Sequence, residues 1–411
     1  MLLTLKNGRV LCPATGRNDI LDVHIADGIF VSFGMAPVGF KPDTVLDVAD
    51  QWILPGLVDM STHLYAEQAP KGLKELEAAL RGGITTVGVA PSAYMPLDTP
   101  EAIHKCREPK TPLSILPIGA LTHGNHQLAD LTALQEAGAV AFSQGQSMSS
   151  LSVLRDCYAY AATFDLLVVI YPNHPSLSQG GVAHEWQVST RLGLIGIPTT
   201  AETTALVQHL LLIQETGVRA HFAHLSCAQS VDIFTQALKK NQPVTAGVSM
   251  AHLWLTETAL LGFHANAHVH PPFRSERDCM ALREAVRDGV IGVISSDHHP
   301  LDATAKLAPF GETIPGISGF DTLLALAHHL SDDIPFPTLL KALTATPAHV
   351  LRQSVGQLKV GMQADCCVYD PTAAWTVSPK TLKSAGHNTP FLGWELPGRV
   401  IYTVVKGQLF V

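Results

Sequence analysis

The feature that most constrains this chain is a repeat of short apolar runs, each followed by a longer amphipathic segment, between residues 55 and 351. Short apolar runs are typical of buried parallel strands, and amphipathic segments are typical of helices that cover a sheet. Such a unit, repeated about eight times over roughly 300 residues, predicts a (β/α)8 barrel. The runs after the first strand are GITTVGVA, LSILPIGAL, AVAFS, LLVVIY, RAHFAHLS, PVTAGVS and VIGVISSD, and the helical segments include KGLKELEAALRG, SVLRDCYAYAATF, TALVQHLLLIQETG and CMALREAVRDG.

The two ends of the chain have a different texture, made of short β-type runs. Residues 1–54 contain LLTLKNGRVL, DVHIADGIFVSFG and TVLDVADQWIL, with Asn-Gly and Asp-Gly pairs that are typical of hairpin turns. This pattern predicts a meander of antiparallel strands. Residues 352–411 return to β-type runs in GQLKVGMQADCCVYDP and GRVIYTVVKGQLFV. We expect both ends to build one small β-sandwich domain beside the barrel of residues 55–351.

Composition limits the kinds of partner and compartment. The formal net charge is -8 and the basic residues are scattered, which argues against a nucleic-acid surface. The seven cysteines have no paired spacing, which argues against a disulfide framework and favours a reducing compartment. The first residues, MLLTLKNGRV, do not have the pattern of a signal peptide, and no apolar run reaches the roughly 18 residues of a membrane helix. We therefore expect a cytoplasmic protein.

Functional side chains of a (β/α)8 barrel are expected at the carboxyl ends of its strands. His63 follows the first strand in LPGLVDMSTHLY, His224 lies in RAHFAHLS, and Asp297 follows VISS. At the mouths of three different strands, these residues could form a ligand set for one divalent metal ion. A single histidine at a strand end is more often a hydrogen-bonded polar group than a ligand. We favour that interpretation, in a solvated loop or beside the site, for His252, His268, His270, His298 and His299.

A set of longer motifs resembles the dihydroorotases of the amidohydrolase superfamily, the longer bacterial type, over the whole chain. The motifs are LPGLVDMSTHL, GGITTV, GLIGIPTTAE, HFAHLSCAQS, ANAHVHPPFRS, SSDHHP, PGISGFDTLL, TPAHVL, LKVGMQADCCVYDP, NTPFLG and GRVIYTVVKG. The resemblance implies a (β/α)8 barrel with a small β-sandwich, and the reversible closure of carbamoyl aspartate to dihydroorotate in pyrimidine synthesis.

The resemblance also implies roles for particular residues. In the family, one or two zinc ions polarise the ring amide carbonyl and supply a hydroxide nucleophile. An aspartate after a late strand moves the proton as general base and acid. By position, Asp297 matches this catalytic aspartate, and His63, His224 and Asp297 match metal ligands.

Several positions depart from the family's metal-binding pattern. Ser61 stands where the family has the first histidine of its Asp-x-His-x-His motif, and Tyr171 stands where it has another ligand histidine. The segment FSQGQ has Gln144 and Gly145 in the family's acidic positions. A hydroxyl group is a much poorer zinc ligand than an imidazole, so a two-zinc centre is not expected.

The positions that contact the substrate also change. Tyr65 replaces the arginine that grips the substrate carboxylate, and Ser92 replaces an asparagine; both remain candidates for substrate binding. Losing even a supporting partner of a zinc ligand typically costs about ten- to a hundredfold in affinity or activity. Here ligands themselves are replaced, and the arginine fork that binds a carboxylate is missing.

Three hypotheses about function follow from these departures, and the third is the least favoured. The segments PIGALTHG, GGVAHE and AKLAPFGETIPGIS resemble a noncatalytic bacterial subclass that binds the aspartate carbamoyltransferase catalytic chain, which implies a structural subunit within a homo- or hetero-oligomer. The alternative is a cyclic amide or imide hydrolase with one zinc ion held by His63, His224 and Asp297. The third is a binder of small molecules at the barrel mouth.

Overall fold

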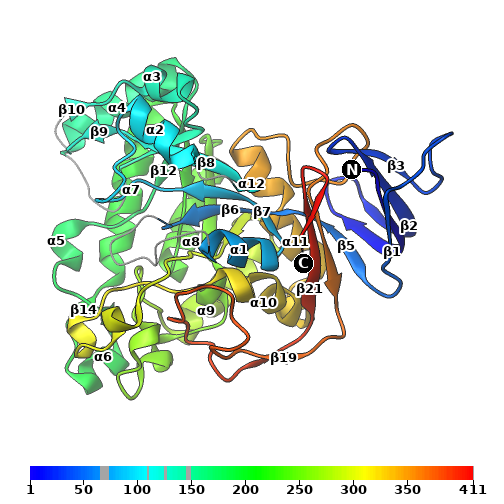
Figure 1. Ribbon diagram of the computed structural model, residues 1–411. Helices are drawn as coiled ribbons and strands as arrows, with labels where there is room; N and C mark the ends of the chain where they lie inside the picture. The colour runs from blue at the N-terminus through cyan, green and yellow to red at the C-terminus, as the bar shows by residue number, and fades with distance from the viewer. Residues whose placement is uncertain (65–73, 109–110, 125–126, 145–149, 411) are drawn as a thin grey trace.

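The structure is a computed structural model that describes residues 1–64, 74–108, 111–124, 127–144 and 150–410. Eight parallel strands form one sheet (Figure 1), and each coincides with a predicted apolar run. The sheet closes where Thr62, in the first strand, forms a parallel bridge with His298, three residues beyond the end of the last strand. The (β/α)8 prediction is therefore confirmed. In sheet order the strands are β6 (Leu57–Thr62), β7 (Ile84–Val89), β8 (Ser114–Ala120), β11 (Ala141–Ser143), β12 (Leu167–Ile170), β15 (Arg219–Phe222), β16 (Val244–Ser249) and β17 (Val293–Ser295).

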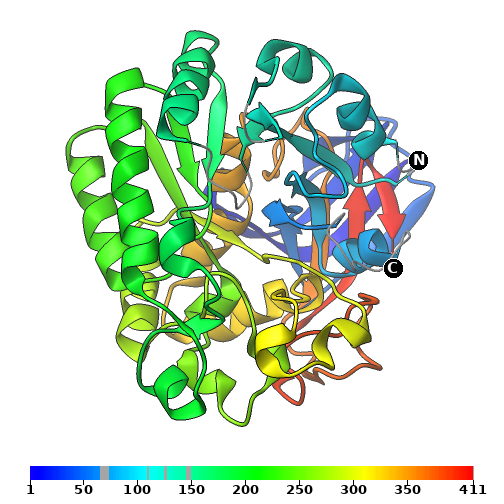
Figure 2. The same cartoon turned by 90° about the vertical axis from the view of Figure 1, so that its left-hand side faces the viewer.

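Helices cover the outside of the barrel because each has an apolar face turned toward the strands. In α9 (Glu276–Arg287) this face is Cys279, Leu282 and Val286, and a Ser275–Asp278 capping box starts the helix. The helix α7 packs between α4 and α8, and these green helices stand side by side in Figure 2. These three helices and the remaining ones have the following bounds: α1 (Lys74–Arg81), α2 (Pro100–Arg107), α3 (Leu131–Glu136), α4 (Leu151–Thr163), α5 (Pro175–Ser178), α6 (Gln187–Leu192), α7 (Thr199–Thr216), α8 (Ala228–Lys239), α10 (Leu323–His329), α11 (Phe336–Leu343) and α12 (Ala345–Val350).

The two chain ends meet in one β domain beside the barrel, as predicted. Its sheet has the order β22-β21-β18-β5-β1-β2-β3, and β4 also pairs with β1. In Figure 1 the blue N-terminal strands and the red β21 lie on the same side of the molecule. The strands are β1 (Leu3–Cys12), β2 (Arg17–Ala26), β3 (Ile29–Phe33), β4 (Thr44–Asp47), β5 (Trp52–Pro55), β18 (Cys366–Asp370), β21 (Arg399–Val405) and β22 (Gln408–Phe410).

The prediction of a purely antiparallel N-terminal meander is wrong in two respects. Both β4 and β5 pair with β1 in parallel, because the chain crosses back over the sheet after β3. The Asn7-Gly8 pair forms a bulge within β1 instead of a turn, and Asn7 has a φ of 62°. A Cβ atom at Gly8 would lie 2.5 Å from Ile53 Cδ1, so the close approach of β5 requires glycine here. The Asp27-Gly28 pair does form the expected two-residue hairpin between β2 and β3.

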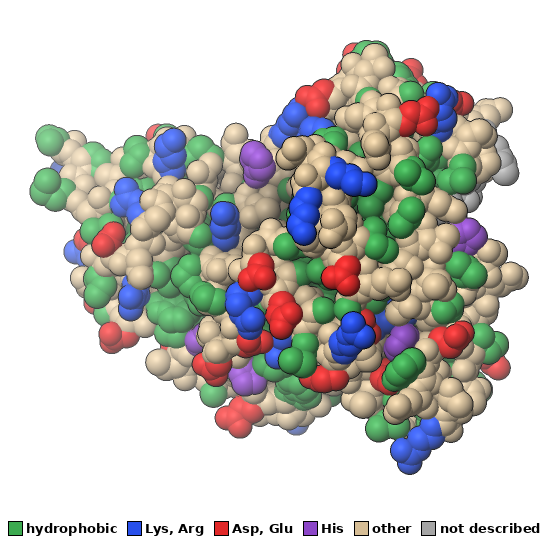
Figure 3. Space-filling view, turned by 180° about the vertical axis from the view of Figure 1, so that it is seen from behind, with side chains coloured by type: hydrophobic (Ala, Val, Ile, Leu, Met, Phe, Trp, Pro, Cys, Tyr) green, Lys and Arg blue, Asp and Glu red, His purple; other side chains and the backbone are tan. Residues whose placement is uncertain are grey.

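The surface and the thiols agree with the expectations from composition. All seven cysteines are buried and free. Acidic and basic side chains are interspersed over the face shown in Figure 3. Among the described residues, no helix has the length and apolar character needed to cross a lipid bilayer. The cytoplasmic location stays a prediction.

Candidate functional site

Three of the predicted site residues meet at the mouth of the barrel. His63 follows β6, His224 lies two residues beyond β15, and Asp297 lies two residues beyond β17. Asp297 Oδ1 is 3.6 Å from His63 Nε2 and 3.7 Å from His224 Nδ1. One carboxylate oxygen therefore faces two imidazole rings at once. The parallel strands produce this meeting because their carboxyl ends share one edge of the barrel.

The backbone at Asp297 is strained. Its φ is 53°, in the left-handed region that side chains other than glycine rarely adopt, at a cost of about 1–3 kcal/mol. Burial acts to raise the pKa of Asp297, but the neighbouring His224 and His63 outweigh it and hold this pKa below the ordinary value. The carboxyl group is therefore held ionised between two imidazoles.

Ser61 and Tyr171 occupy two of the altered ligand positions, and they bind each other. Ser61 Oγ lies 3.1 Å from Tyr171 Oη, across the barrel from β6 to the end of β12. The Tyr171 ring also packs edge-on against the His224 ring, with centroids 5.6 Å apart. Burial raises the pKa of Tyr171 above its ordinary value, so the phenol stays neutral. Two neutral hydroxyl groups thus satisfy each other where the resemblance implies two imidazole ligands.

Asp59 lies two residues before Ser61 in the same strand and is almost fully buried. It accepts hydrogen bonds from the backbone N–H of Ser61, at 3.2 Å, and from the N–H and hydroxyl of Ser296. Burial raises the pKa of Asp59 to about 7, despite these hydrogen bonds. The interior of the barrel therefore contains a second carboxyl group that is partly protonated near neutral pH.

The residues at the mouth do not fit a metal centre as they are arranged. Among the described residues, no three His, Cys, Asp or Glu side chains are grouped so that they could hold a metal ion. His224 directs Nε2 toward Ser295 Oγ, at 3.1 Å, and the Ser61–Tyr171 pair is closed on itself. Metal ligation by His63, His224 and Asp297 stays a prediction.

The other predicted positions are placed as follows. Ser92 Oγ accepts the backbone N–H of Met95, at 3.1 Å, in a local turn after β7. Gln144 Oε1 accepts the hydroxyl of Thr122, at 2.9 Å. The prediction for Tyr65 as a substrate contact falls outside the described residues, as does the position of Gly145. Substrate binding by Ser92 therefore stays a prediction.

The histidines interpreted as ordinary polar groups are less exposed than expected. His252 is buried, with Nδ1 2.7 Å from Ser249 Oγ and Nε2 3.1 Å from Pro271 O. His268 is buried and pairs with Thr313 Oγ1, at 2.7 Å. They are hydrogen-bonded, as predicted, but they do not lie in solvated loops. Burial lowers the pKa of His252 and that of His268 to about 4, so both rings are neutral.

A buried arginine contributes to the wall beside His224. Arg274 donates to Ser226 Oγ at 3.0 Å and to Ile197 O at 2.9 Å, and it lies 3.6 Å from Glu202. Glu202 in turn accepts the Ser226 N–H at 2.9 Å. Because Arg274 is held by these partners, it is a poor substitute for the substrate-binding arginine that the resemblance implies near the first histidine pair.

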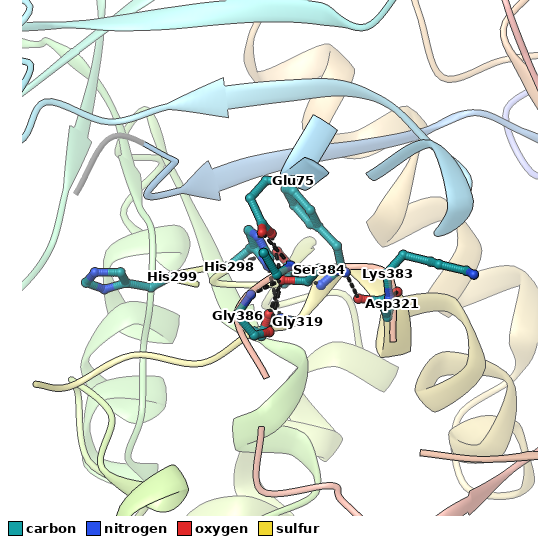
Figure 4. A network of polar contacts seen from close by, with 12 residues as sticks. Glu75, His298, His299, Gly319, Asp321, Lys383, Ser384 and Gly386 are labelled. Carbon is teal, nitrogen blue, oxygen red and sulfur yellow. Dashed lines mark hydrogen bonds and ion pairs between the residues drawn. The ribbon is translucent and has the colours of Figure 1, made fainter. Parts of the chain in front are cut away.

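A network around His298 was missed by the sequence analysis (Figure 4). His298 is fully buried; its Nε2 lies 2.9 Å from Glu75 Oε2, and its Nδ1 accepts the Gly319 N–H at 3.1 Å. Since Nδ1 is an acceptor, the ring is neutral and donates through Nε2. Glu75 also accepts the Ser384 hydroxyl, at 2.6 Å, and the Ala385 N–H, at 2.7 Å.

This network holds the backbone that carries two of the candidate site residues. The carbonyl of His298 accepts the backbone N–H of His63, at 2.8 Å, so the two strand ends that carry His63 and Asp297 are joined. In Figure 4, His298 turns toward Glu75 and Ser384, whereas His299 points the opposite way. The signal in the sequence was an acidic residue on the apolar face of α1, where Glu75 is buried with Leu76, Ala78 and Ala79.

The comparisons with known proteins cover the whole chain. Residues 50–230 match the Dihydro-orotase-like family, and residues 230–411 match the Amidohydrolase family. A dihydroorotase-like protein of Pseudomonas aeruginosa is 43% identical over 421 residues, covering 100% of this chain and 99% of the relative. A dihydroorotase of Syntrophus aciditrophicus is 36% identical over 425 residues, with the same two coverages.

A solved structure agrees in fold. The L-hydantoinase (dihydropyrimidinase) of Arthrobacter aurescens superposes with a TM-score of 0.86 at 21% identity, covering 100% of this chain and 96% of that one. At this identity the likeness supports the fold alone. The full-length relatives, together with the barrel and the residues at its mouth, show that the chain belongs to the dihydroorotase-like family of amidohydrolases.

Proposed function

We propose that this dihydroorotase-like protein lacks dihydroorotase activity and serves as a structural subunit of an aspartate carbamoyltransferase complex in pyrimidine synthesis. The observation that carries the first half is the bond between Ser61 and Tyr171. In metal-dependent amide hydrolysis, an ion polarises the carbonyl and generates the nucleophile from water. A closed pair of neutral hydroxyl groups supplies neither function.

The remaining polar groups at the mouth do not compensate for this loss. One oxygen of Asp297 already faces His63 and His224, at 3.6 and 3.7 Å. Gln144, in a position where the family has an acid, is neutral and accepts a hydrogen bond from Thr122. A tenfold loss of rate corresponds to about 1.4 kcal/mol, and several such losses together remove most of a catalytic advantage.

The structural role is supported by what the chain retains. The barrel and the β domain are complete, and the buried Glu75–His298 network ties the barrel mouth to the C-terminal loop. The relative at 43% identity is named a dihydroorotase-like protein, whereas the relative at 36% is named a dihydroorotase. A retained fold around an altered site favours an assembly role, and the partner is inferred from the resemblance to the noncatalytic subclass.

Co-expression with the aspartate carbamoyltransferase catalytic chain of the same organism tests this proposal. We expect the two chains to co-elute in size-exclusion chromatography and the complex to show transferase activity. Because assembly does not require chemistry at the mouth, a His63→Ala variant is expected to co-elute and support activity equally well. Separate elution of the wild-type protein, with transferase activity unaffected by its presence, would contradict the structural role.

The second candidate is a cyclic amide or imide hydrolase with a single metal ion. It is favoured by one observation, the two distances of 3.6 and 3.7 Å that bring His63 and His224 to the same oxygen of Asp297. Tyr65 and Ser92 would then contact a substrate other than dihydroorotate. Such an enzyme would bind one equivalent of zinc and lose it in a His224→Ala variant.

A further inference from the structure

A cavity lies at the end of the barrel opposite the mouth. It has a volume of about 260 Å³ and lies between the end of α1, the start of α10 and the C-terminal strands. Arg81 and Gly82 line it just before β7 begins, which places it at the amino ends of the strands. Tyr369, Trp375 and Leu324 form apolar parts of its wall. None of the predicted site residues that the structure describes lines it.

This cavity is lined by more basic than acidic residues. Among the residues that the structure describes, Arg81, Lys383 and Arg399 line it together with one carboxylate, Asp321. Both oxygens of Asp321 are engaged, because they accept the backbone N–H of Lys383 at 2.7 Å and that of Ser384 at 3.1 Å. The carboxylate therefore holds the loop in place and is less available to pair with the three cationic side chains.

The cations have few partners of their own. Arg81 lies 3.8 Å from Glu77 in a pair whose side chains are 39% and 61% exposed, so this pair is weak. Within the described residues, neither Lys383 nor Arg399 forms an ion pair. The Arg399 guanidinium lies 5.9 Å from the Trp375 ring centroid, an arrangement that orients it against the cavity wall. Three exposed cationic residues thus line one small space, and within the described residues only Arg81 has an ion pair.

We propose that this cavity binds a small phosphate monoester. A phosphate dianion matches several cations around one cavity better than a single carboxylate does, and arginine forks bind phosphate oxygens in bidentate fashion. The volume lies just below the range of about 300–1,000 Å³ that holds drug-sized ligands, so it suits a sugar phosphate and excludes a dinucleotide. The aromatic side chains provide an apolar surface for a ring.

Part of the cavity wall is held by the hydrogen-bond network around His298. The loop that carries Lys383 is bound at its backbone to Asp321, and the next residue, Ser384, is bound to Glu75. In Figure 4 the Lys383 side chain extends away from Glu75 while its backbone faces Asp321. A fixed backbone lowers the cost of ordering the cations around an anion. The proposed site does not depend on whether the barrel mouth is catalytic.

Isothermal titration calorimetry with ribose 5-phosphate, on the purified full-length protein, tests this proposal. We expect saturable binding that weakens with added salt, and no binding of uncharged ribose. A Lys383→Met/Arg399→Met double variant is expected to bind at least about tenfold more weakly, because each charged hydrogen bond typically contributes about a tenfold factor. Lys380→Met is the matched control, since Lys380 is exposed and lies outside the cavity.

Three results would overturn the proposal. One is the absence of ribose 5-phosphate binding to the wild-type protein. Another is equal binding by the double variant, with circular dichroism showing that the variant is folded. The third is inorganic phosphate binding as tightly as ribose 5-phosphate, because the apolar wall would then play no part in recognition.

Discussion

Replacing Glu75 by alanine is expected to lower the free energy of unfolding by about 3–5 kcal/mol, because two buried donors and one partly buried donor lose their acceptor. These donors are the Nε2–H of His298, the hydroxyl of Ser384 and the N–H of Ala385. The Ser384 hydroxyl also lies 2.7 Å from Ser318 Oγ, which keeps part of the network intact. Urea denaturation at pH 7 measures the effect.

Glu77→Ala is the matched control for this prediction. Glu77 lies on the same helix, but its side chain is 61% exposed and its only ion pair in the described part of the chain is the 3.8 Å contact with Arg81. We expect the control to change stability by less than about 0.5 kcal/mol. A loss for Glu75→Ala no larger than for Glu77→Ala would show that the buried network contributes little to stability.

Replacing Asp59 by asparagine is expected to remove a pH dependence of stability between about pH 4 and pH 7. The folded protein raises the pKa of Asp59 from 3.8 to about 7, so in this range the folded state holds a proton that the unfolded state has lost. Stability is therefore fully present below pH 4 and falls as the pH rises to 7, by an amount on the order of 3–4 kcal/mol as an upper bound.

The asparagine variant reproduces the protonated carboxyl group. Its amide oxygen can accept the N–H groups of Ser61 and Ser296, and its NH₂ can donate to the Ser296 hydroxyl. We expect Asp59→Asn to be more stable than the wild type at pH 8 and nearly equal to it at pH 4. Urea denaturation across this range measures both. A wild type whose stability did not differ from that of the variant at pH 8 would contradict the raised pKa.

The barrel could be predicted from the sequence because its signal is repeated and local. Each buried strand is a short apolar run, and parallel topology brings the strand ends together, so His63, His224 and Asp297 were placed at one mouth. The order of strands in the β domain could not be predicted in the same way. The parallel pairing of β4 and β5 with β1 depends on a chain crossing and on the Asn7 bulge, and the Asn-Gly pair equally favours a turn.

The supporting contacts of the site lay beyond sequence reasoning. Ser61 and Tyr171 are interpreted from the sequence as replacements of ligand histidines, but their mutual hydrogen bond joins residues 110 positions apart. The Glu75–His298 and Glu75–Ser384 bonds span 223 and 309 positions. Such pairs are set by the closing of the barrel and the docking of the C-terminal loop, which no local pattern records.

The most direct test of the account is an assay of dihydroorotate hydrolysis by the purified protein, supplied with one equivalent of zinc or manganese. We predict no turnover above the protein-free control, because the Ser61–Tyr171 pair stands where the resemblance implies ligand histidines. The His224→Ala variant is expected to give the same baseline. Turnover at an ordinary enzyme rate of about 1–10³ s⁻¹, abolished in His224→Ala, would contradict the proposed loss of activity.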